Sequence, residues 1–299
     1  MTKAFQSASG IQTRYQRLSS GEALARIRAS KGNQEFDVWH GGPADGYAAA
    51  KAEGLLEPYV PPIASQIPAQ LKDKDGAWTG VYVGALGFCS NTSVLNQLGV
   101  AVPTAWDDLL NPKLKGQIAM SHPATSGTAF TAFWTVVTLN HFDLDQSFAY
   151  FKKLHNNILQ YPKTGSAPGP MAGRGEVATA IIFAHDCVMF NEQGMTDLTV
   201  SFPSEGTGYE IGGVAIIQGA RNAAAARQYV AWALTAEAQE IPPTVQSYQL
   251  PTNPRAAVSA KSPKLSEIKL VDYDFVRSGA QKNAITERFD AEIAPAPKQ

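Results

Sequence analysis

Long hydrophobic runs and an excess of charge of either sign are both missing from this 299-residue sequence. No stretch of roughly 18 apolar residues occurs, so no membrane-spanning helix is expected. The 25 Lys and Arg residues balance the 26 Asp and Glu residues, which argues against a nucleic-acid partner. The sequence also lacks a G-x-S-x-G turn and a Walker phosphate loop. We therefore expect neither an enzyme nor a bound cofactor.

Residues that ligate transition metals are scarce, with two cysteines and five histidines in the chain. Cys89 and Cys187 lie 98 residues apart in apolar surroundings, and this pattern favours two buried thiols over a disulfide or a metal site while leaving the redox state of the pair open. His122 and His141 have no neighbour at metal-binding spacing, so we expect them to be ordinary surface or loop residues. The sequence predicts no metal site.

The sequence instead shows an alternation of strand and helix patterns. Near the N-terminus, a helix that stops at Gly10 precedes a predicted strand at 13–17, a helix at 21–30, and a buried strand at 36–39 that leads into a turn at 40–43. Alternation of this kind is typical of an α/β fold whose parallel sheets are joined by right-handed crossovers.

Two long strand patterns lie far apart in the sequence, at residues 79–90 and 212–218. A second run of strands and helices lies between them, and two extended crossings of the chain would form a hinge between two lobes. The sequence therefore predicts a first lobe of residues 1–82 and 214–256, a second lobe of residues 83–213, and a C-terminal helical segment of residues 257–299.

Five separate segments occur in the order and spacing of a known family. They are residues 37–42 (DVWHGG), 53–59 (EGLLEPY), 85–88 (ALGF), 106–116 (WDDLLNPKLKG) and 205–213 (EGTGYEIGG). Over nearly its whole length the chain resembles the ferric-iron-type periplasmic binding proteins of ABC importers. The resemblance implies an α/β, two-lobed periplasmic binding protein type II fold with two hinge strands and a ligand held between the lobes.

Iron-binding members of that family hold the metal with two adjacent tyrosines, just after a strand that corresponds to residues 178–183. This sequence has His185 and Asp186 at that place, without the phenolate ligands that suit ferric iron. It is more similar to the hexose-phosphate-binding members, which carry such a His-Asp pair followed by an EGTGYE segment. By that resemblance His185, Asp186 and Glu210 would hold sugar hydroxyls.

The resemblance also implies an ABC transporter permease as partner, a monomer, and a periplasmic location. Members of the family begin with a signal peptide and a first strand, and neither has a counterpart in the opening segment MTKAFQSASG. We therefore expect the natural product to extend upstream of Met1 and to be exported.

Predicted helix N-termini in both lobes suit a phosphate group, because free N–H groups and the positive end of the helix dipole attract anions. Ser19 and Ser20 open a helix in the first lobe, and Thr125, Ser126, Gly127 and Thr128 open one in the second, while Ser166 precedes a third helical segment. The alternative interpretation of each is ordinary N-capping.

His185 and Asp186 follow the apolar run 180–184 directly, so they lie at the carboxyl end of a strand, where open α/β sheets bind their ligands. The alternative is that both bond only to local backbone. Glu210 precedes the second crossing and could complete the set, whereas Glu205 is expected to be a surface loop residue.

His40 ends a strand and Thr79 begins the first crossing, so both are candidate ligand contacts, whereas Trp39 and Trp78 are expected in the core. The favoured solute is a hexose phosphate or a related phosphorylated anion. The alternatives are a phosphonate such as 2-aminoethylphosphonate, ferric iron, or an enzymatic role for His185 and Asp186.

Overall fold

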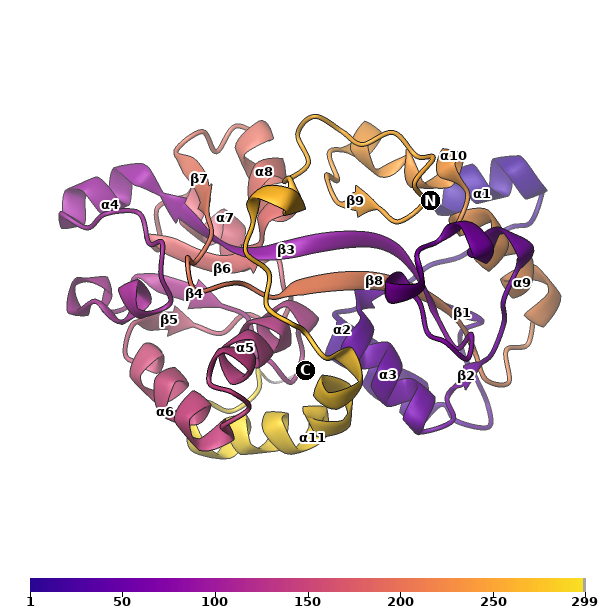
Figure 1. The fold of residues 1–299 in the computed structure, drawn as a ribbon, viewed down its shortest axis with the longest axis horizontal. Helices are drawn as coiled ribbons and strands as arrows, with labels where there is room; N and C mark the ends of the chain where they lie inside the picture. The colour runs from indigo at the N-terminus through magenta and orange to yellow at the C-terminus, as the bar shows by residue number, and fades with distance from the viewer. Residues whose placement is uncertain (298–299) are drawn as a thin grey trace. The chain divides into compact units, whose positions relative to one another are not determined.

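Helices and strands alternate along residues 1–297, the part of the chain that the computed structural model describes (Figure 1). The helices are α1 (Thr2–Ser9), α2 (Ser20–Ala29), α3 (Ala44–Ala52), α4 (Thr92–Leu98), α5 (Gly127–Leu139), α6 (Leu144–His155), α7 (Pro168–Gly173), α8 (Ala184–Glu192), α9 (Ala223–Ala233), α10 (Ala236–Gln239) and α11 (Phe275–Glu292). The strands are β1 (Val38–Pro43), β2 (Leu56–Glu57), β3 (Thr79–Asn91), β4 (Ile118–Met120), β5 (Ile158–Gln160), β6 (Thr179–Phe183), β7 (Leu198–Ser201), β8 (Tyr209–Ile217) and β9 (Leu250–Pro251).

Local signals in the sequence explain several helix ends. Gly10 ends α1 with a left-handed φ of 73°, a conformation that glycine adopts without a Cβ penalty. Ser19 and Glu22 form a capping box at the start of α2, and each satisfies backbone N–H groups that the first turn leaves without partners. Asp143 accepts from the N–H of Gln146 and so caps α6.

The chain divides into two units. Unit 1 comprises residues 1–83, 211–260 and 275–280, and unit 2 comprises residues 84–210, 261–274 and 281–299. The long strands β3 and β8 (Figure 1) each contribute residues to both units. The lobe boundaries expected from the sequence stay a prediction.

Strand directions are mixed. In unit 2, β4 pairs in parallel with β5 and with β6, as the alternating pattern predicts. The expectation of parallel pairing is wrong for the long strands, because β3 pairs antiparallel with β6, β7 and β9, and β8 pairs antiparallel with β1 and β2. Alternation constrains strands that follow one another along the chain, whereas β3 and β8 pair with strands that are distant in sequence.

The predicted strand at residues 13–17 does not form, and the segment is irregular. Tyr15 is 78% exposed, and the side chain of Thr13 bonds to the carbonyl oxygen of Thr2. A strand needs a neighbouring strand to satisfy its backbone groups, and β propensity alone does not supply one. The strand predicted at 36–39 lies later, at Val38–Pro43, and includes the residues that were expected to form a turn.

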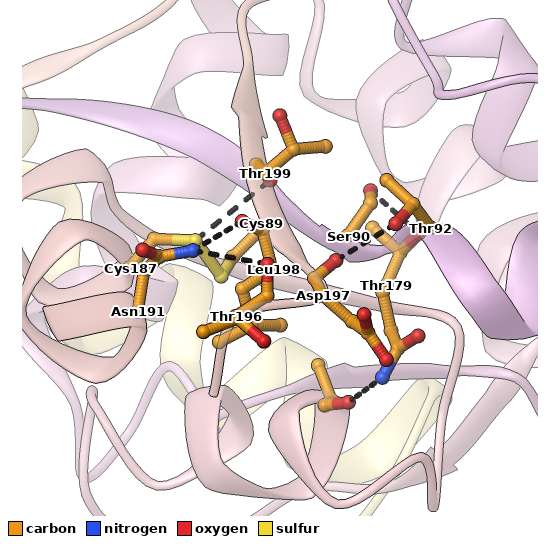
Figure 2. The surroundings of a disulfide bond; sticks show 12 residues. Cys89, Ser90, Thr92, Thr179, Cys187, Asn191, Thr196, Asp197, Leu198 and Thr199 are labelled. Atoms are coloured by element: carbon orange, nitrogen blue, oxygen red, sulfur yellow. Dashed lines mark hydrogen bonds between the residues drawn. A yellow bond between two sulfur atoms is a disulfide. The ribbon is translucent and has the colours of Figure 1, made fainter. Parts of the chain in front are cut away.

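The prediction of two free thiols is also wrong, because Cys89 and Cys187 form a disulfide (Figure 2). The antiparallel register of β3 and β6 places Cys89 opposite Ala180, and α8 follows β6 directly. Helix α8 therefore carries Cys187 back to β3, with a Cα–Cα distance of 5.6 Å. Both cysteines are buried, as expected, but their sequence separation carried no information about strand pairing.

Each unit has its own apolar core. In unit 1, Phe5 and Tyr229 pack edge to face beside Val81. In unit 2, α5 is buried along eleven of its thirteen residues and carries no charge, and its Phe133 stacks on Phe151 of α6. Among the described residues, no helix combines the length and the apolarity needed to cross a membrane.

Candidate ligand-binding site

Three parallel strands in unit 2 end at the same edge of their sheet. β5, β4 and β6 are neighbours in that order, with Ile118 of β4 opposite Ile158 of β5 and Met120 of β4 opposite Ile181 of β6. The segment after β4 leads into α5, the segment after β5 into α7, and β6 runs directly into α8. The carboxyl edge of a parallel sheet is where α/β proteins bind ligands, so the predicted site residues of unit 2 gather where a site is expected.

The N-terminus of α5 presents hydroxyl groups beside a glycine. Ser126 is the N-cap, and its side chain accepts from the N–H of Ala129 at 3.4 Å. Thr128 is the second residue of the helix, and its hydroxyl has no hydrogen-bond partner among the described residues. A Cβ at Gly165 would lie only 2.1 Å from Thr128 Oγ1 and 3.1 Å from Ser126 Oγ, so the loop after β5 touches this helix end.

The loops after β4 and β5 are tied together by hydrogen bonds. Thr125 Oγ1 donates to the carbonyl oxygen of Lys163 at 2.8 Å, and Ser121 Oγ donates to that of Thr164 at 2.6 Å. Thr125 therefore uses its hydroxyl within the protein. Ser166 is half-buried and lies just before α7, with its carbonyl oxygen accepting from the N–H of Gly169.

His185 and Asp186 lie in the first turn of α8, and Glu210 lies in β8 close to them. His185 Nε2 is 3.8 Å from Asp186 Oδ1 and 3.9 Å from Glu210 Oε1. The three predicted residues are thus brought together in unit 2. His185 and Glu210 are almost fully buried, while the side chain of Asp186 keeps 21% of its surface exposed.

The ring of His185 is packed between neighbouring residues. Its ring stacks on Phe183 at 5.6 Å between centroids, and a Cβ at Gly84 would lie 2.6 Å from its Nδ1. Burial lowers the pKa of His185, although the carboxylate of Asp186 acts in the opposite direction. The imidazole is therefore neutral at neutral pH, and its buried Nδ1 has no hydrogen-bond partner within residues 1–297.

In unit 1, the two predicted serines differ in what they bond. Ser19 Oγ donates to Glu22 Oε2 at 2.7 Å, so this hydroxyl serves the capping box. Ser20 lies against the backbone of Gly42, where an added Cβ would be 2.5 Å from Ser20 Oγ. Gly42 has a positive φ of 86°, and its N–H donates to the hydroxyl of Tyr82 at 3.0 Å.

The remaining predicted contacts of unit 1 lie elsewhere. His40 Nδ1 is 3.2 Å from the hydroxyl of Tyr229, and the residue lines a cavity of about 250 Å³. Removal from water lowers the pKa of His40 to about 4, so its ring is neutral. Thr79 is buried at the start of β3. Trp39 stacks on Tyr47 at 4.1 Å, in the core as expected.

His122 lies in a loop, between β4 and α5, but the expectation of a surface position is wrong because the residue is completely buried. Its partner Ala294 is 172 residues away in sequence, so no local spacing could have revealed it.

Gly84 and Gly165 were also missed as contacts of site residues, since isolated glycines give no local signal. Glu205 is exposed, as expected. Within residues 1–297, no group of three or more His, Cys, Asp or Glu side chains could hold a metal ion.

This geometry can be compared with that of known proteins. Residues 1–269 match the family described as bacterial extracellular solute-binding proteins, and the chain belongs to this family. Its architecture is that of the ferric-binding-like periplasmic binding proteins, and the family and its periplasmic relatives indicate a periplasmic location. It is a solute-binding protein of the ABC-importer class, and the relatives that it matches are solute-binding proteins.

Two solved structures are similar over almost the whole chain. The periplasmic binding protein AfuA from Actinobacillus pleuropneumoniae, with fructose-6-phosphate bound, has a TM-score of 0.94 and 40% identity, covering 99% of this chain and 94% of that one. The periplasmic binding protein P5PA has a TM-score of 0.92 and 33% identity, covering 98% and 94%.

More distant relatives carry other names. A periplasmic protein of Salmonella typhi, named for 2-aminoethylphosphonate binding, is 32% identical over 184 residues, which cover 59% of this chain and 50% of that protein. A ferric binding protein from Campylobacter jejuni has a TM-score of 0.80 at 20% identity, covering 97% of this chain and 94% of that one. That likeness concerns the fold alone.

Proposed function

We propose that this chain binds a hexose phosphate and delivers it to an ABC permease. The observation that carries the proposal is the placement of two different polar groups at the carboxyl edge of β5, β4 and β6. One is the N-terminus of α5 with the available hydroxyl of Thr128, which suits a phosphate. The other is the His185, Asp186 and Glu210 set, which suits sugar hydroxyls.

The chemistry of the second set supports a polyhydroxylated solute. Carboxylates accept hydrogen bonds from hydroxyls, and a neutral imidazole offers one donor and one acceptor. Vicinal hydroxyls need such a mixture, whereas inorganic phosphate does not. The binding of fructose-6-phosphate by the similar AfuA protein agrees with this assignment.

A phosphonate is the second candidate, and a specific observation favours it. Asp186 and Glu210 place two carboxylates within 4 Å of one imidazole nitrogen, and an ammonium group would also be attracted there. The name of the Salmonella typhi relative points in the same direction. Both candidates share the anionic group and differ in the part that contacts the carboxylates.

Isothermal titration calorimetry on the purified chain separates these functions. We expect tight binding of fructose 6-phosphate, much weaker binding of fructose and of inorganic phosphate, and recovery of the solute unchanged. Tight binding of 2-aminoethylphosphonate with no response to any hexose phosphate would reject the first candidate in favour of the second. Ferric binding without a response to any phosphorylated solute would reject both.

A further inference from the structure

His122 lies at the centre of the loop between β4 and α5, and the loop is folded around it. Its backbone N–H donates to the carbonyl oxygen of Pro162 at 3.0 Å. Its own carbonyl oxygen accepts from the N–H groups of Thr125 at 3.1 Å and of Ser126 at 2.9 Å. Hydrogen bonds to this residue therefore help to shape the segment that supplies the N-cap of α5, together with the bonds of Ser121 and Thr125 to the loop after β5.

The imidazole of His122 joins this loop to the end of the chain. Nδ1 is 3.2 Å from the N–H of Ala124, and Nε2 is 2.8 Å from the carbonyl oxygen of Ala294, just after α11. A backbone N–H can only donate and a carbonyl oxygen can only accept. The tautomer is therefore fixed, with a bare Nδ1 that accepts and a protonated Nε2 that donates.

The surroundings of the ring favour its neutral form. The ring is fully buried and lies edge to face against Phe289, at 5.1 Å, and Tyr161, at 6.0 Å. The charged group that faces it is the carboxylate of Asp290 on α11, with Oδ1 3.3 Å from Nε2. Burial lowers the pKa of His122, while the Ala294 carbonyl and Asp290 act in the opposite direction. Burial raises the pKa of Tyr161, so this neighbour carries no charge.

We infer that His122 is a positioning residue for anion binding: its neutral imidazole, anchored on Ala294, holds the loop that presents the N-terminus of α5 to the solute. The inference rests on the function proposed above, because it assigns the phosphate group to that helix end. A loop fixed before binding loses less conformational freedom when the anion is bound. The C-terminal segment thereby contributes to affinity from a position that does not touch the solute.

Two substitutions separate the two hydrogen bonds of the ring. His122→Asn retains an acceptor for the Ala124 N–H, because Asn Oδ1 and His Nδ1 are the same number of bonds from Cα. His122→Gln retains a donor for the Ala294 carbonyl but loses the acceptor, which leaves a loop N–H without a partner. We expect His122→Gln to weaken the binding of fructose 6-phosphate and of inorganic phosphate by about tenfold or more. His122→Asn keeps the bond within the loop but loses the anchor on Ala294, so it should weaken binding of both solutes by a smaller factor, about threefold.

Both variants should melt at lower temperature than the wild type, because each loses one buried hydrogen bond. Wild-type affinity of His122→Gln for both solutes, together with a lower melting temperature, would mean that His122 has only a structural role. A wild-type chain that binds neither solute would instead reject the proposed function, and this inference with it.

A pH profile tests the inference on protein that keeps His122. Protonation of Nδ1 would place a donor against the Ala124 N–H, so wild-type affinity for fructose 6-phosphate should be lost as the pH falls through the lowered pKa of His122, under the ordinary value for histidine. Asp290→Asn removes the carboxylate that favours the charged ring, so the pKa of His122 falls further and the loss of affinity moves to lower pH. The phosphate group of the solute titrates identically in both experiments, so it does not contribute to the difference between the two proteins. Superimposable pH profiles for the two proteins would overturn the inference.

Discussion

Asp186 is the acidic residue of the candidate site that is most open to a solute. Its side chain is 21% exposed, compared with 4% for Glu210, although both reach within 4 Å of His185 Nε2. A partly exposed carboxylate can exchange water for a sugar hydroxyl, whereas a buried one is less accessible to the solute. Asp186 is therefore the residue whose removal should report most directly on the sugar.

Replacing Asp186 with alanine should weaken the binding of fructose 6-phosphate by about 2 kcal/mol, or roughly thirtyfold in Kd. The loss of a charge-assisted acceptor for a hydroxyl explains the effect. Inorganic phosphate, which has no such hydroxyl, should bind the variant as it binds the wild type. Asp186→Asn, which retains a neutral acceptor, should lose less. Calorimetry on the three proteins measures all of these differences, and an equal loss for both solutes would indicate damage to the fold.

For single residues, the sequence predicted which residue types lie at the helix N-termini, but not which of their hydroxyls are left available to bind a solute. The hydroxyl of Ser19 bonds to Glu22 and that of Thr125 to the carbonyl oxygen of Lys163, while the Thr128 hydroxyl has no such partner in the described part of the chain. The difference depends on where the loop after β5 runs. No pattern within residues 125–128 specifies that path.

Among the elements, α5 is unusual because an uncharged, buried helix begins at the candidate anion site. Its first N–H groups lack intrahelical partners, as in any helix, and the close approach of Gly165 keeps the space beside Thr128 narrow. A phosphate bound there would receive backbone N–H donors and the Thr128 hydroxyl together. The N-terminus of α5 and the loop after β5 would therefore enclose the phosphate together.

Substitution of Thr128 by valine, which keeps the shape and removes the hydroxyl, should weaken phosphate binding by about 1 to 3 kcal/mol. Thr128→Ser keeps the hydroxyl and is the matched control, with affinity close to that of the wild type. Fructose 6-phosphate and inorganic phosphate should lose affinity equally, since both present the same group. Unchanged affinity of Thr128→Val for both solutes would exclude this hydroxyl from the site.

The position of an element along the chain was predicted well where a local pattern specifies it, but the pairing of strands was not. The patterns for α2, β3, β6 and β8 agree with the structure to within a few residues. The strand predicted at 13–17 failed because its existence depends on a partner strand, and the direction of β3 relative to β6 depends on pairing across about 90 residues. Local propensity contains neither piece of information.

For the molecule as a whole, five sequence segments that occur in the order and spacing of the family predicted the α/β periplasmic binding fold that the structure shows. The disulfide was not predicted, since it requires the register that sets Cys89 opposite Ala180. It closes a loop between residues 98 positions apart. In the chain-entropy description, a closed loop of that length restricts the unfolded chain substantially.

Removing both cysteines, as Cys89→Ala with Cys187→Ala, should lower the free energy of unfolding by about 2 to 5 kcal/mol. The measurement is the urea midpoint under oxidising conditions. Wild-type protein with its disulfide reduced is the control, because it keeps the volume of both sulfur atoms, and it should unfold at a similarly reduced midpoint. Equal midpoints for the oxidised wild type and the double variant would contradict the prediction.

The position of the disulfide has a consequence for how the protein is made. Cys187 follows Asp186 directly in the first turn of α8, so the covalent bond to β3 anchors the turn that carries two candidate ligand residues. Disulfides persist in oxidising compartments and are rare in the cytosol. A chain that folds in the cytosol would hold this turn by packing alone. In the oxidising periplasm the cross-link can form, so there the turn that carries His185 and Asp186 is held by a covalent bond as well as by packing.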